Sequence, residues 1–266
     1  MKKQQEILMS SKRPHVSYSE LTTFLQCRWK HKRKYIEKIY LDSTGPFATF
    51  GKSVHSVCED IMTGTDRSDL PNHFTKNFAT MIVETLGKDL SIDDKRLLVT
   101  LNEQGRPLVE HVFEAVESYF GDCEVFSVEE KLFEPITKNG MKFKGYIDLV
   151  LKKGDKYHII DWKTSTWGWK ARKKSDKLTT YQLTLYKHYF AKKHKIDPKN
   201  IETHFGLLKR TAKKNPIEIF RVTSGEKKTQ NALKLLNDSL YNMESGVCIR
   251  NKLKCQYCEY KHTEWC

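Results

Sequence analysis

The hydrophobic periodicity of the chain changes near residue 124, and this change constrains the fold more than any other feature of the sequence. Residues 47–62 and 73–120 place apolar side chains three and four positions apart, as in HVFEAVESYF. This spacing predicts amphipathic helices. From residue 124 the period becomes two, and the alternating runs cover residues 125–132, 143–151 and 157–162. Short turn-forming stretches separate these runs, so they predict a meander of three strands.

The rest of the chain returns to mixed periodicity. We expect helices over residues 178–192 and 227–244, and strands over residues 204–208 and 217–222. Ser17 or Ser19 is expected to cap a first helix that extends through Trp29. This order of elements predicts an α/β (α+β) fold in a single domain over residues 16–266, preceded by a frayed segment over residues 1–15.

The charge of the chain favours a polyanionic partner. It has 47 Lys and Arg residues against 33 Asp and Glu residues, a formal net charge of +14, and such a field attracts phosphate backbones. A basic surface that serves only solubility is the alternative. No apolar run is long enough for a membrane span, and the start lacks a secretory signal, so we expect a cytoplasmic protein. Seven cysteines then fit reduced thiols or metal ligands better than disulfides.

Two carboxylates and a lysine lie on neighbouring strands of the predicted meander. Asp148 falls near the end of the second strand, and Asp161 and Lys163 lie on the third. Because side chains alternate along a strand, Asp161 and Lys163 project from one face, while Ile160 and Trp162 project from the other. Converging carboxylates suit Mg²⁺ or Mn²⁺, whose chemistry includes phosphodiester hydrolysis. An exposed charge pair beside a turn is the alternative, which the apolar residues before Asp161 disfavour.

Four motifs in this region resemble those of the PD-(D/E)xK nucleases of the RecB-like branch. Their G-x-x-x-H, G-x-x-D, D-x-K and Q-x-x-x-Y patterns match Gly51 to His55, Gly145 to Asp148, Asp161 to Lys163 and Gln182 to Tyr186. The resemblance implies a restriction-endonuclease-like core over residues 124–222, with a mixed central sheet flanked by helices. Residues 16–123 would form a helical part that carries His55.

The resemblance also implies roles for individual residues. A divalent ion would be held by His55, Asp148, Asp161 and the backbone carbonyl of Trp162, and Lys163 would orient the attacking water. Gln182 and Tyr186 share one helical face and would position substrate, although a core tyrosine beside a solvent-facing glutamine is the alternative. Glu130 is a weaker catalytic candidate. It shares a strand face with Val128 and Leu132, and the family often carries an acid in this strand, but Glu129 is its neighbour.

The cysteine pattern resembles that of a smaller group within this family. Cys27 and the closing pattern Cys255-x2-Cys258-x7-Cys266 resemble the iron–sulfur exonucleases of CRISPR adaptation, the AddB nuclease domain and related phage exonucleases. In these proteins four thiolates hold a [4Fe-4S] cluster, which would here join residues 223–266 to the start of the chain. The last spacing is longer than the commonest family pattern, and His262 lies within it. A Zn²⁺ site on Cys255, Cys258, His262 and Cys266 is therefore the alternative, and it would leave Cys27 unused.

The segment from residue 164 to residue 177 is basic, contains two tryptophans and has no apolar periodicity. We expect a mobile loop that faces the substrate, with Lys170, Arg172 and Lys173 in contact with phosphates. Trp167 and Trp169 would stack on unpaired bases, or would pack beneath the loop.

Together these features predict a metal-dependent DNA exonuclease that acts at DNA ends in recombination, repair or phage DNA processing. Its expected setting is a bacterial, archaeal or phage-infected cell, and its expected substrate is DNA that is single-stranded or has accessible ends. No ATP-binding motif G-x-x-x-x-G-K-[ST] occurs, so unwinding would need a helicase or recombination partner. A structure-specific endonuclease and a partner-dependent, noncatalytic DNA-binding subunit are the alternatives.

Overall fold

The computed structural model describes residues 14–41, 45–87, 89–136, 140–256 and 258–266. Nearly all of the segment that we predicted to be frayed, residues 1–15, lies outside this range. Six strands form a mixed sheet. Their bounds are β1 (His15–Ser17), β2 (Glu124–Pro135), β3 (Lys142–Lys153), β4 (Lys156–Ser165), β5 (Ile201–Lys209) and β6 (Ile217–Val222).

The strands β2, β3 and β4 form the predicted antiparallel meander. β5 then joins β4 in parallel after a helical crossover, and β6 returns antiparallel to β5. β3 has two partners along one edge, because β4 pairs with Leu149–Lys153 and β1 pairs with Lys142–Lys144. Between these two ladders the second half of β4 diverges from β3, and the chain places Asp148 at this split.

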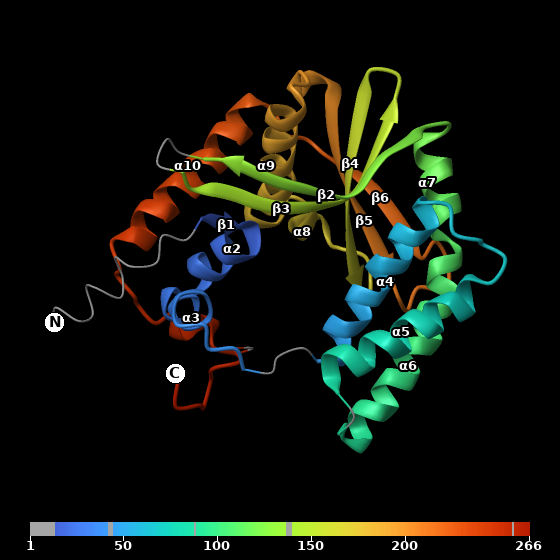
Figure 1. Ribbon diagram of the computed structural model, residues 1–266, viewed down its shortest axis with the longest axis horizontal. Coiled ribbons are helices and arrows are strands. Elements are labelled where there is room, and N and C mark those ends of the chain that lie inside the picture. Colours follow the sequence, from blue (N-terminus) through green and yellow to red (C-terminus); the bar gives the residue numbers. More distant parts are fainter. Residues whose placement is uncertain (1–13, 42–44, 88, 137–139, 257) are drawn as a thin grey trace.

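Helices cover both faces of the sheet. On one side lie α4 (Pro46–Met62), α5 (Leu70–Leu86), α6 (Ile92–Glu110) and α7 (Val112–Phe120), and on the other lie α9 (Lys177–His194) and α10 (Glu226–Glu244). Figure 1 shows these two layers with the sheet between them. The helices α2 (Tyr18–Gln26) and α3 (Arg28–His31) stand near the N-terminal end, and α8 (Ala171–Lys174) is a single turn between β4 and α9.

The two layers of helices enclose two apolar cores. Ile159 contributes to the core under α9 and α10, whereas Ile160 and Trp162 contribute to the core under α4 to α7. The predicted alternation along β4 is therefore confirmed, and it leaves Asp161 and Lys163 on the α9 face.

The structure differs from the sequence predictions in three short segments. Ser17 caps α2 as predicted, since its Oγ accepts a hydrogen bond from the Glu20 amide at 3.2 Å, but the helix breaks at Cys27, whose backbone is extended. β1 was not expected. The loop predicted over residues 164–177 is shorter and partly helical, because β4 continues to Ser165 and α8 forms one turn.

Contacts between distant parts of the sequence join the two ends of the chain. Trp29 Nε1 and Arg33 Nε donate hydrogen bonds to the Trp265 carbonyl at 2.9 and 3.0 Å, and the Tyr260 hydroxyl donates to the Ile39 carbonyl at 2.6 Å. The C-terminal segment consequently lies beside α3 (Figure 1). Among the helices of the described residues, none is long and apolar enough to cross a membrane.

Candidate active site

Asp148 and Asp161 face each other where β3 and β4 separate. The last residues paired between the two strands are Leu149 and Ile160, so Asp148 and Asp161 are the next position along each strand. The Asp148 carboxylate fills the opening, because its Oδ2 accepts a hydrogen bond of 2.6 Å from the Trp162 amide. Asp161 is buried and Asp148 is half-buried. The split in the sheet therefore brings both carboxylates of the G-x-x-D and D-x-K motifs together.

Lys163 lies beside the more deeply buried carboxylate. Its Nζ is 2.6 Å from Asp161 Oδ2, as expected for residues two apart on one strand face. Burial acts to lower the pKa of Lys163, but the Asp161 carboxylate outweighs burial, and the pKa is raised. The ammonium group is therefore charged at neutral pH.

Gln182 and Tyr186 reach the same place from α9, which Asp176 caps through a 2.7 Å hydrogen bond from the Thr179 amide. Gln182 Nε2 donates to Asp161 Oδ1 at 2.9 Å and to the Tyr186 hydroxyl at 3.1 Å. The Tyr186 ring lies directly against Gly145 of β3, where an added Cβ would be 2.7 Å from a ring carbon. Only glycine permits this approach, so the first residue of G-x-x-D and the last of Q-x-x-x-Y form one packing unit.

His55 approaches from the helices on the other side of the sheet. Its Nδ1 is 3.6 Å from Asp148 Oδ2. One turn earlier, Gly51 packs closely against Thr164 of β4, so α4 lies tightly on the strand that carries Asp161. Burial lowers the pKa of His55 to about 4. The imidazole is therefore neutral at pH 7, which is the form that binds metal ions.

The electrostatics of the cluster fit a divalent cation. Burial and the neighbouring Asp161 carboxylate raise the pKa of Asp148 well above its ordinary value. Asp161 Oδ2 is buried and has no aligned hydrogen-bond donor, although the Lys163 ammonium is close to it. Two repelling carboxylates with unused lone pairs, together with an imidazole nitrogen, form a hard donor set that suits Mg²⁺ or Mn²⁺. The predicted ligand role of the Trp162 carbonyl stays a prediction.

The weaker candidate, Glu130, lies elsewhere. Its carboxylate is held by Lys193 Nζ at 2.6 Å and His194 Nε2 at 2.7 Å, at the C-terminal end of α9. These hydrogen bonds outweigh burial and lower its pKa. The structure thus places Glu130 in a hydrogen-bonded group with Lys193 and His194, and its catalytic role stays a prediction.

The neighbouring Glu129 is exposed and lies beside the cluster. It lies opposite Asp148, because the paired residues on either side of it are Val128 with Leu149 and Glu130 with Ile147. Partial burial, Glu59 and Asp161 raise its pKa. Its φ of 46° breaks the regular alternation of β2. Glu129 is therefore a further candidate beside Glu130, and the repeated acid at 129 and 130 was the available signal.

The two tryptophans of the basic segment have different environments. Trp167 is 67% exposed. Trp169 packs inward, with ring centroids 5.2 Å from Phe205 and 6.3 Å from Phe220, and Lys173 Nζ lies over its ring. Trp169 therefore follows the packing alternative, and Trp167 is available to a ligand. The basic side chains at Lys170, Arg172 and Lys173 are exposed.

A groove of about 450 Å³ adjoins the cluster and shares Tyr186 with it. Its tyrosines come from four segments of the chain: Tyr18, Tyr35, Tyr40, Tyr146 and Tyr186. Tyr40 and Tyr146 are 66% and 40% exposed, and Lys38 and Lys144 also line the groove. The groove beside Tyr186 is thus lined by aromatic rings and cations.

The cysteines of the predicted cluster lie where the two ends of the chain meet. Cys27 Sγ accepts a hydrogen bond from the Asn251 amide at 3.4 Å, and Cys255 Sγ donates to the Asn251 carbonyl at 3.6 Å. Cys27 and Cys255 therefore lie on either side of Asn251. Cys258 is half-buried, whereas Cys266 and His262 are exposed. The [4Fe-4S] ligand set and the alternative Zn²⁺ ligand set both stay predictions.

Comparisons with known proteins identify the family of the chain. The family model of the PD-(D/E)XK nuclease superfamily matches residues 15–266. A solved structure of a candidate exonuclease from Eubacterium rectale is similar with a TM-score of 0.57 at 14% identity, covering 94% of this chain and 88% of that one. The structure of SSO0001 has a TM-score of 0.43 at 12% identity, covering 97% and 91%. No protein of curated function matches. Because the family model spans the chain from β1 to Cys266, the chain belongs to the PD-(D/E)XK nuclease superfamily.

Proposed function

We propose that the protein is a divalent-metal-dependent deoxyribonuclease of the RecB-like branch that degrades DNA from an end. The observation that carries this proposal is the meeting of His55, Asp148 and Asp161 with Lys163 at the split between β3 and β4. A noncatalytic DNA-binding subunit would gain nothing from repelling carboxylates beside a phosphate backbone.

Each residue of the cluster has a chemical task in this proposal. His55, Asp148, Asp161 and the Trp162 carbonyl would hold Mg²⁺ or Mn²⁺, which lowers the pKa of bound water and offsets charge on the scissile phosphate. Lys163 orients the attacking water or the phosphate through its charged ammonium group. Gln182 fixes the orientation of Asp161 and, with Tyr186, contacts the substrate strand.

The tyrosine groove favours a single-stranded substrate. Exposed rings such as Tyr40 and Tyr146 offer faces on which unpaired bases can stack, with about 1–3 kcal/mol for each stacked base. Trp167 offers a further exposed ring for stacking. Lys170, Arg172 and Lys173 would contact the phosphates that follow.

A [4Fe-4S] cluster on Cys27, Cys255, Cys258 and Cys266 is the second part of the proposal. It is supported by the position of Cys27 beside Cys255, across Asn251. A zinc site on the C-terminal residues alone would leave Cys27 without a ligand role. The cluster would be structural, since it lies where the chain ends meet and away from the carboxylates.

The biological role follows from the chemistry. A nuclease that acts on DNA ends belongs to recombination, repair or phage DNA processing, and a helicase partner would supply the unwound strand. A structure-specific endonuclease is the alternative, and it requires no free end.

The test is cleavage of end-labelled linear DNA and covalently closed circular DNA, single- and double-stranded, in Mg²⁺ or Mn²⁺. We expect linear DNA to be degraded and circles to be spared. Lys163→Ala should reduce the rate by at least about 10²-fold. Lys234→Ala, which removes an exposed lysine paired with Asp238 on α10, should retain the rate. Cutting of circles would favour the endonuclease, and binding without cleavage in either metal would refute a nuclease activity of the isolated chain.

A further inference from the structure

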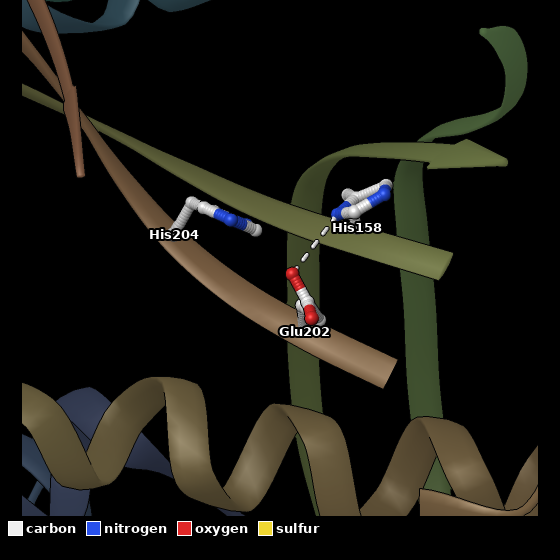
Figure 2. A group of neighbouring side chains, drawn as sticks. All are labelled: His158, Glu202 and His204. Carbon is white, nitrogen blue, oxygen red and sulfur yellow. Dashed lines mark ion pairs between the residues drawn. The ribbon is translucent and has the colours of Figure 1, made fainter. Parts of the chain in front are cut away.

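Three potential metal ligands meet on the face of the sheet opposite to Asp161. His158 of β4 and Glu202 and His204 of β5 bring one ligand atom each within 4.8 Å of one another. In the part of the chain that the structure describes, no other group of three His, Cys, Asp or Glu side chains is so close. Figure 2 shows the three side chains gathered between the two strands.

The pairing of β4 with β5 accounts for this group. His158 is the direct partner of Glu202, and Ile160 is the direct partner of His204. Glu202 and His204 are two residues apart, so both side chains project from the same face of β5. Their partners His158 and Ile160 project from the same face of the sheet on β4. Nδ1 of His158 is 3.7 Å from Glu202 Oε2. Two ligands from one strand and a third from its neighbour thus lie close enough together to share one cation.

His204 is buried, and one of its two ring nitrogens has no hydrogen-bond partner. It is 2% exposed, and the unpaired nitrogen is Nδ1. The rings of Phe120 and Tyr119 at the end of α7 cover it, with centroids 5.0 and 5.6 Å away. Because an unpaired buried polar atom destabilises a fold, such a residue calls for an explanation. A bound cation would supply the missing partner.

Arg221 of β6 acts against a cation, since its Nη2 is 3.1 Å from Glu202 Oε1. That ion pair leaves Oε2 directed at His158.

We propose that His158, Glu202 and His204 form a second metal site, for Zn²⁺, separate from the nuclease centre. Two imidazoles and one carboxylate are a known zinc ligand set, in which water takes the fourth position. The ion would join β4 to β5 three residues before Asp161. The ion would thereby stabilise β4, the strand that carries the D-x-K motif, without contacting Asp161 or Lys163.

The test compares zinc content after equilibrium dialysis of the wild-type chain, His158→Ala and Glu202→Gln. The cysteines and the catalytic carboxylates remain in every variant, so a difference reports on this group alone. We expect the wild type to retain an additional zinc ion per chain and to show a larger rise in melting temperature with zinc. Arg221→Gln should bind zinc more tightly, because Glu202 loses its competing partner.

His73→Ala is the control, since His73 is also a histidine paired with a carboxylate, that of Asp60. It should retain the zinc content of the wild type. Equal zinc content in the wild type, His158→Ala and Glu202→Gln would overturn the proposal. An equal loss in His73→Ala would do the same, because the binding would then be unspecific. Circular dichroism of each variant confirms that a lost ion is not a lost fold.

Discussion

Glu129 and Glu130 of β2 are adjacent in sequence, and their carboxylates have opposite surroundings. Glu129 adds negative charge near Asp148 and Asp161, whereas Glu130 is held by hydrogen bonds from Lys193 and His194. We predict that Glu129→Gln weakens activation by Mg²⁺ or Mn²⁺, because a cation loses part of the field that attracts it. Glu130→Gln should leave this activation unchanged and lower the free energy of unfolding by about 1 kcal/mol.

Cleavage rates as a function of metal concentration, together with urea unfolding, separate the two effects. Each variant serves as the control for the other, since both replace a glutamate by its neutral isostere on one strand. A stronger effect of Glu130→Gln on metal activation would restore Glu130 as the catalytic acid.

Asp148 gives a prediction about pH. Its pKa is raised in the folded protein by burial and by Asp161, so the fold favours the protonated form. In the metal-free protein, stability should therefore fall as the pH rises above the ordinary aspartate pKa of about 4. Asp148→Asn should flatten this dependence and raise the melting temperature in EDTA at pH 8. One kcal/mol corresponds to roughly 2–4 °C for a chain of this size.

The effect of divalent ions on the melting temperature gives a second test of Asp148. We expect Mg²⁺ or Mn²⁺ to raise the melting temperature of the wild type at pH 8 and to have little effect on Asp148→Asn. If both proteins have the same pH profile and the same response to metal, the carboxylate pair is not a cation site.

At the level of the elements, the contact between β3 and α9 depends on Gly145. A methyl group at this position would lie 2.7 Å from the Tyr186 ring, so the ring and the hydroxyl that Gln182 contacts must shift. We predict that Gly145→Ala lowers the free energy of unfolding by about 1–3 kcal/mol and also lowers the cleavage rate.

A double-mutant cycle with Tyr186→Ala tests the cause of this effect. Removal of the ring should cancel most of the destabilisation by Gly145→Ala, because the two changes act on one contact. Gly225→Ala is the control, since nothing lies within 4 Å of the added methyl group there. Additive effects of Gly145→Ala and Tyr186→Ala would show that the contact is not the reason for the glycine.

The elements also show what sequence periodicity can predict. The meander β2 to β4 and the long helices α4, α9 and α10 extend over many residues, so their periods are well defined, and the predicted bounds differ by a few residues from those observed. β1 and α8 contain three and four residues, which is too few for a period to appear. The break at Cys27 depends on one extended residue.

Sequence periodicity predicted one part of the candidate site and missed another. The alternation of D-x-K placed Asp161 and Lys163 on one face, and the structure confirms this placement. The left-handed backbone at Glu129 could not be read from the alternation of β2, because glutamate rarely adopts it. The separation of β4 from β3, which lets Asp148 accept the Trp162 amide, depends on strand pairing that a single strand does not encode.

The whole molecule joins its two ends at one place. Trp29 of α3 has Arg33 and Arg250 over its ring, with centroid distances of 4.3 and 4.4 Å. Within the described residues 245–256 and 258–266, only Tyr260 is buried. These contacts bury little apolar surface, so they stabilise the junction weakly. A cofactor on Cys27 and the C-terminal cysteines would close a loop of nearly the whole chain, where a cross-link removes the most entropy from the unfolded state.

Cysteine variants therefore test how the molecule is held together. We predict that anaerobically purified protein is brown and contains iron and sulfide, and that Cys27→Ala and Cys258→Ala lose both. Their loss should lower stability by about 2–5 kcal/mol, as for a native cross-link, and should expose the segment after α10 to proteolysis. Cys123→Ala, which changes a half-buried thiol beside the α4 to α7 core, should keep the colour. Colourless, zinc-loaded protein that is unaffected by Cys27→Ala would instead support the site that includes His262, since that site needs no ligand from the start of the chain.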